Sequence, residues 1–144
     1  MNSHYKVLLG AILLLLPLAS VADTPEPTVK ITPIKANLYL LKGKGGNVVA
    51  SVGDDGILII DDDYVEYGPA YHRALMSISE TDGVPRLVLN THWHFDHVGS
   101  NAYWGERGSV ILAQANVYER MSTQQEIQFF DLPMEPSPAV ALPI

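Results

Sequence analysis

The stretch Thr91-His92-Trp93-His94-Phe95-Asp96-His97-Val98-Gly99 decides how the rest of the chain is interpreted. It holds three imidazoles and one carboxylate within six residues, in the pattern His-x-His-x-Asp-His. Directly before it, residues 86–90 form a short apolar run that follows the turn-like segment 82–85, which predicts a buried strand. The cluster is therefore expected at the C-terminal end of a strand, where the backbone leaves the sheet.

The spacing within this cluster favours a metal site. Side chains two apart on an extended segment point to the same side, so His92 and His94 can converge on one ion while the aromatic residues beside them point the other way. A turn after Phe95 lets Asp96 and His97 face the same pocket. Imidazole and carboxylate ligands suit zinc, and also iron or manganese. A loop that binds nothing is disfavoured, because imidazoles packed this closely repel one another when protonated.

The nine-residue motif resembles the signature of the metallo-β-lactamase-fold hydrolases. Upstream, residues 56–61 are similar to that family's apolar strand, which ends in an aspartate beside the metal loop. The resemblance runs from about Val29 to the C-terminus and covers the first half of the usual domain. It implies an α/β fold, an αββα sandwich of the metallo-β-lactamase type, with only the first half present in residues 23–144.

The resemblance also implies roles for single residues. His92 and His94 would bind a first metal with a third histidine from farther along. Asp96 and His97 would bind a second metal with another histidine. Asp96 would also orient the nucleophile, a hydroxide held between two metals. Asp61 would hold the metal loop through hydrogen bonds to backbone N–H groups or imidazole. The expected cofactor is zinc, two ions in the intact protein, with iron or manganese as alternatives and an iron redox enzyme as another reading.

The later part of the family's site has no counterpart in these residues. No histidine follows His97, and Asp131 stands in none of the family's later motifs, which include an aspartate that bridges both metals. We therefore expect weak metal binding by the 144-residue chain and, without a second sheet, exposure of Ile57, Ile59 or their neighbours. A fragment, a truncated gene product and a partial record are all consistent with the sequence. The alternative function is a non-catalytic remnant.

The N-terminus has the pattern of a secretory signal peptide. One lysine, Lys6, precedes the apolar run 7–18, which is shorter than the ~20 residues that span a bilayer. Small residues lead up to Ala22, so cleavage is expected after it, with a periplasmic or secreted mature protein and no stable membrane anchor. The chain has no cysteine, which excludes disulfides and a lipid-modified cysteine.

The net charge of the chain restricts the classes of molecule that it is expected to bind. The formal net charge is −7, and residues 1–22 contain no acidic residue, so the rest of the chain is more acidic still. That balance disfavours nucleic acid and favours a small-molecule substrate. β-Lactams, lactones and thioesters are not ranked by this sequence, and the oligomeric state is not indicated.

Apolar periodicity and turn signals predict the remaining elements. Strands are expected at 29–34, 37–42, 47–52, 56–61 and 109–113, helices at 69–81, 98–104 and 114–125, and irregular chain at 129–144. Residues 43–47 are interpreted as a glycine-rich turn, since they lack the spacing of a phosphate loop. Asp62 and Asp63 are expected in a solvated acidic turn, and His72 on the surface.

Overall fold

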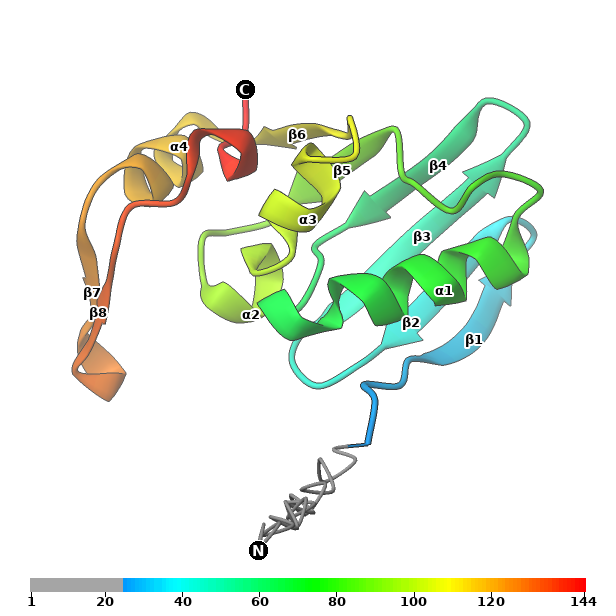
Figure 1. Cartoon of the computed structure of the whole chain (residues 1–144), viewed down its shortest axis with the longest axis horizontal. Helices are drawn as coiled ribbons and strands as arrows, with labels where there is room; N and C mark the ends of the chain where they lie inside the picture. The colour runs from blue at the N-terminus through cyan, green and yellow to red at the C-terminus, as the bar shows by residue number, and fades with distance from the viewer. Residues whose placement is uncertain (1–24) are drawn as a thin grey trace, which may run out of the picture.

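A six-stranded sheet forms the centre of the computed structural model, which describes residues 25–144 (Figure 1). The strands lie in chain order: β1 Lys30–Lys35, β2 Leu38–Lys42, β3 Asn47–Gly53, β4 Gly56–Ile60, β5 Leu87–Asn90 and β6 Val110–Ala113. Strands β1 to β4 pair antiparallel, whereas β4 with β5 and β5 with β6 pair parallel. The parallel pairing brings the C-terminal ends of β4 and β5 to the same edge of the sheet.

Short helices connect the parallel strands. Between β4 and β5 lie the 3-10 turn η1, Val65–Tyr67, and helix α1, Gly68–Ile78; between β5 and β6 lie α2, Phe95–Val98, and α3, Asn101–Gly105. After β6 come α4, Ala115–Ser122, and a two-stranded hairpin of β7, Gln125–Ile127, and β8, Leu132–Met134, followed by the 3-10 turn η3, Ala139–Ala141. This hairpin lies apart from the main sheet (Figure 1).

The core lies between one face of the sheet and helices α1 and α3. Tyr71 and Leu75 of α1 and Trp104 of α3 are fully buried against that face. Their partners are alternate apolar residues of the strands: Leu41, Val48, Ala50, Ile57, Ile59, Val88 and Ile111. The alternation follows from the period of two along a strand.

The other face of the sheet is apolar and has no helix over it in the described part of the chain. The side chains there are half-buried or exposed, namely those of Leu38, Leu40, Val49, Leu58, Ile60, Leu87, Leu89, Val110 and Leu112. The expectation of an exposed face is met by Leu58 and Ile60, while Ile57 and Ile59 face the core.

Two element predictions need correction. The helix expected at 98–104 is two short helices, because α2 already begins at Phe95, where the His94 carbonyl accepts the first helical hydrogen bonds. Residues 129–144 are not irregular throughout, since Leu132–Met134 pairs with Gln125–Ile127 across a turn in which Asp131 has a positive φ of 47°. Pro133 is compatible with this two-stranded edge.

The predicted signal peptide, residues 1–22, lies outside the described residues. Within residues 25–144, no helix combines the length and apolar character needed to cross a membrane.

Candidate metal centre

The His-x-His-x-Asp-His motif lies where β5 ends, beside the end of β4. His92 follows β5 in a bend and His94 in extended backbone, and the single turn of α2 then carries Asp96 and His97. The predicted position at the C-terminal end of a strand is therefore where the structure places the motif. Trp93 packs against the small cluster formed by Val98, Val117 and Met121, which anchors the segment, and its ring centroid lies 5.0 Å from that of His94.

The four motif side chains lie close together. His92, His94 and Asp96 offer ligand atoms that all lie within 4.8 Å of one another, and so do Asp61, His92 and His97. The Nε2 atom of His97 lies 3.5 Å from Asp96 Oδ2. The rings of His92 and His97 have centroids 4.0 Å apart. The two groups share His92, so one cluster of side chains contains all four residues that the sequence singles out as metal ligands.

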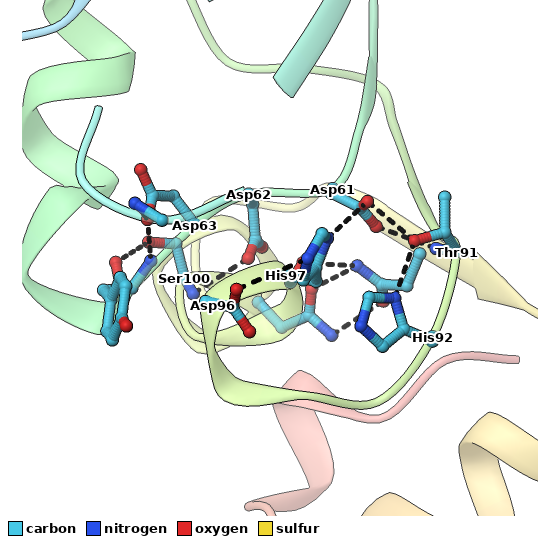
Figure 2. Close-up of polar contacts among 12 residues, drawn as sticks. Asp61, Asp62, Asp63, Thr91, His92, Asp96, His97 and Ser100 are labelled. Atoms are coloured by element: carbon cyan, nitrogen blue, oxygen red, sulfur yellow. Dashed lines mark hydrogen bonds and ion pairs between the residues drawn. The ribbon is translucent and has the colours of Figure 1, made fainter. Parts of the chain in front are cut away.

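Asp61 orients two of these imidazoles from the end of β4 (Figure 2). Its Oδ2 lies 2.8 Å from His97 Nδ1 and 2.7 Å from the Thr91 hydroxyl oxygen, and its Oδ1 accepts the Thr91 N–H at 2.7 Å. The Thr91 hydroxyl also lies 2.9 Å from His92 Nδ1. Since this hydroxyl gives its one proton to Asp61, His92 Nδ1 donates to it. Both His92 and His97 therefore present an Nε2 lone pair to the pocket.

These residues fit a divalent metal ion. The donors are imidazole nitrogens and a carboxylate, and a carboxylate behind the imidazole is the usual support for a metal-binding histidine. Partial burial, and then electrostatic interaction with the neighbouring imidazoles of His97 and His94, lower the pKa of His92 below its usual value. The neutral imidazole that a metal requires is therefore favoured at His92.

The acidic turn after β4 is not solvated, contrary to the expectation for Asp62 and Asp63. Both residues are fully buried, and Asp61 is 3% exposed. Asp62 Oδ1 accepts the Ser100 N–H at 3.0 Å, and its own N–H donates to the His97 carbonyl at 3.0 Å. Burial raises the pKa of Asp62 well above its usual value. Positive φ angles at Asp61 and Asp63 (61° and 64°) turn consecutive side chains toward different segments.

Several residues that support the site carried no role in the sequence interpretation. Thr91 is one, and a buried amide pair is another: Asn90 and Asn101 exchange hydrogen bonds at 3.1 and 2.9 Å, and Asn101 also donates to the Ala141 carbonyl. The polar Asn90 at the end of an otherwise apolar strand was the available signal. His72, half-buried, bonds Tyr103 and the Asp82 carbonyl and belongs to neither of the two candidate ligand groups.

The hydroxyl of Thr91 gives a direct test of this orientation. Thr91→Val keeps the shape of the side chain and the backbone bond to Asp61 but leaves His92 Nδ1 without its acceptor. We expect zinc affinity to fall about 10- to 100-fold, the usual cost of losing a group that orients a ligand. Thr91→Ser should retain affinity. Chelator competition measures both, and a valine variant as tight as the wild type would show that the hydroxyl does not orient His92.

Comparison with known proteins agrees with this fold. The sequence model of the family described as "Metallo-beta-lactamase superfamily" matches residues 31–137. A Cronobacter sakazakii metallo-β-lactamase with a HARLDQ motif superposes with a TM-score of 0.68 at 18% identity, over 83% of this chain and 47% of that one. MEM-A1, a subclass B3 metallo-β-lactamase from a soil metagenome library, gives 0.62 at 21% identity, over 81% and 44%. No curated protein matches the chain significantly in sequence.

The fold and the family follow from these matches. At such identities the solved structures establish the fold alone, and this chain spans about half of their length. The family match covers most of the chain, including the whole of the motif and the strand that ends at Asp61. The chain therefore belongs to the metallo-β-lactamase superfamily, whose fold it shares over the first half of the domain.

Proposed function

We propose that this protein is a zinc-dependent hydrolase of a small-molecule substrate. The observation that carries the proposal is the convergence of His92, His94, Asp96 and His97 in one cluster. Hydrogen bonds at Nδ1 of His92 and His97 leave the Nε2 lone pairs of these two imidazoles available to a metal. Most members of the superfamily are hydrolases, and the acidic character of the chain disfavours nucleic acid as substrate.

The residues divide into ligands and supports. His92 and His94 would hold one ion, and Asp96 and His97 a second, with further ligands from the part of the domain that the solved relatives have and these residues do not cover. Bound zinc supplies a Lewis acid that lowers the pKa of water and polarises the group to be cleaved. Asp61 fixes the ring orientation of His97 directly and that of His92 through Thr91.

Metal competition tests the cofactor. Nitrogen and carboxylate ligands bind divalent metals in an order that places zinc above manganese and ferrous iron. Metal-free protein equilibrated anaerobically with equimolar zinc, manganese and ferrous iron, then separated from free metal, should retain mainly zinc by elemental analysis. Predominant retention of iron, with redox activity, would instead support the iron enzyme and contradict the zinc assignment.

We also propose that the protein is exported. The apolar run 7–18 is too short to span a bilayer, and small residues precede Asp23. Expression in a bacterial host should give a mature protein in the periplasm or medium whose first residue is Asp23, as read by N-terminal sequencing. Met1 retained on a cytosolic protein would contradict export. Replacing Leu13 by Arg within the apolar run should block processing and serves as the control.

A further inference from the structure

The glycine-rich turn between β2 and β3 lies directly against the candidate metal ligands. A Cβ atom added to Gly46 would lie 2.5 Å from His97 Cε1, and one added to Gly45 would lie 2.8 Å from Asp96 Cβ. The Gly46 N–H also donates to the Asp96 carbonyl at 3.3 Å. Only glycine allows the backbone this close to both side chains. The turn, residues 43–46, therefore forms one wall of the cluster of candidate ligands.

The buried carboxylate of Asp63 holds this wall in place. It accepts the N–H groups of Lys44 and Gly45, each at 2.9 Å, and the Tyr71 hydroxyl at 2.8 Å. The Tyr71 oxygen in turn accepts the Gly43 N–H at 3.0 Å. Three consecutive N–H groups of the turn thus bond Asp63 directly or through one hydroxyl. They have partners within the protein, which argues against a phosphate-binding role for the turn.

The wall restricts the ring of His97 at Cε1, the atom between its two nitrogens. Asp61 holds Nδ1, and the Gly46 backbone occupies the space into which the ring would otherwise turn. If the turn moves outward, the Asp96 carbonyl loses a donor and the His97 ring gains freedom. The position of Asp96 and His97 therefore depends on a carboxylate that is itself not a ligand.

We propose that Asp63 is a positioning residue: it fixes the turn 43–46 against Asp96 and His97, and so sets the geometry in which those two side chains bind metal. The proposal rests on the proposed zinc site and adds to it a residue that the sequence interpretation treated as solvated. The same hydrogen bonds and close approaches predict that a methyl group at Gly46 acts like loss of the Asp63 carboxylate, because both separate the wall from His97.

The experiment compares two variants with three controls. Asp63→Asn keeps the size of the side chain but places an amide NH₂ against backbone donors, and Gly46→Ala displaces the wall without touching Asp63. Each should weaken zinc binding about 10- to 100-fold in chelator competition. Asp55→Asn, in the turn between β3 and β4, and Gly53→Ala, at the end of β3, should leave zinc binding unchanged. Ile111→Val, a core change, should lower the melting temperature without changing zinc affinity, as a purely structural effect would.

Amide exchange separates this proposal from the zinc site itself. In metal-free wild type, the Lys44 and Gly45 N–H groups should exchange slowly, and in Asp63→Asn they should exchange rapidly. Failure of the wild type to bind zinc contradicts the proposed function. Rapid exchange of these two amides in the wild type contradicts the proposal that Asp63 fixes the turn. Wild-type zinc affinity in a folded Gly46→Ala protein overturns the positioning role, and this variant decides the matter if Asp63→Asn does not fold.

Discussion

Zinc binding should be lost when His92 and His94 are both replaced by alanine. The two imidazoles are the first of the four converging ligands, and His92 belongs to both candidate ligand groups. Removing ligands takes away the metal–ligand bonds themselves, so the loss should exceed the about 10- to 100-fold typical of groups behind the ligands. Elemental analysis after gel filtration, together with chelator competition, should show metal in the wild type and none above background in the double variant.

A histidine outside the pocket provides the matched control. His72 makes two hydrogen bonds, to Tyr103 and to the Asp82 carbonyl, but is in neither candidate ligand group. His72→Ala should therefore retain the zinc content of the wild type even if its melting temperature falls. Equal zinc in the wild type and in the double variant would show that the motif is not the metal site. Far-ultraviolet circular dichroism of each variant checks that the protein compared is folded.

The convergence of the candidate ligands could be predicted from sequence because the information for it is local. His92, His94, Asp96 and His97 lie within six residues, and the strand before them is a plain apolar run with a turn ahead of it. The end of a strand followed by one turn is enough to predict that the four side chains meet. The same locality explains the correct expectation of the strands around residues 47–52 and 56–61, which are separated by an Asp-Gly turn.

The residues that support the candidate ligands could not be predicted in the same way, because their roles depend on which distant segments of the chain meet in the folded structure. Asp62 and Asp63 read as an acidic turn, since three consecutive carboxylates are usually solvated. Their burial depends on backbone donors from Ser100, Lys44 and Gly45, between 18 and 38 residues away in sequence. Likewise, the sequence predicts only that Gly46 lies in a turn. Its packing against His97 in the structure shows why no side chain fits at this position.

The predicted boundaries of the helix at 98–104 were wrong for a related reason. The apolar pattern around Val98 and Trp104 predicts one helix, but the chain turns immediately after His94, whose carbonyl accepts the first helical hydrogen bonds. Helix α2 therefore begins at Phe95, three residues earlier. The backbone then breaks at Ser100, whose N–H bonds Asp62 and whose hydroxyl donates to the Tyr64 carbonyl. These tertiary bonds compete with a continuous helix, and short helices have little intrinsic stability to oppose them.

The polypeptide of residues 1–144, purified by itself, should show no substantial hydrolase activity even with added zinc. It supplies four candidate ligands, whereas the family resemblance implies two further histidines and a bridging aspartate from the second half of the domain. Removing a single electrostatic interaction with the transition state can reduce the rate by a factor of ~100 or more. The apolar sheet face that carries Leu58 and Ile60 also lacks a covering layer in the described residues, and association through it would reduce the folded, monomeric fraction.

Supplying the second half of the domain from a superfamily member, fused or as a separate chain, should therefore restore metal stoichiometry and activity together. Both gains have one cause, because the added segment would cover the open sheet face and bring the remaining ligands to the edge where β4 and β5 end. The assay compares residues 1–144 alone, the complemented protein and its His94→Ala variant on a lactam, a lactone and a thioester. Turnover by residues 1–144 alone within about tenfold of a full-length relative, and abolished by His94→Ala, would be faster than the absence of even one such interaction permits. That result would mean that these four ligands, with Asp61 and Thr91 behind them, suffice for catalysis.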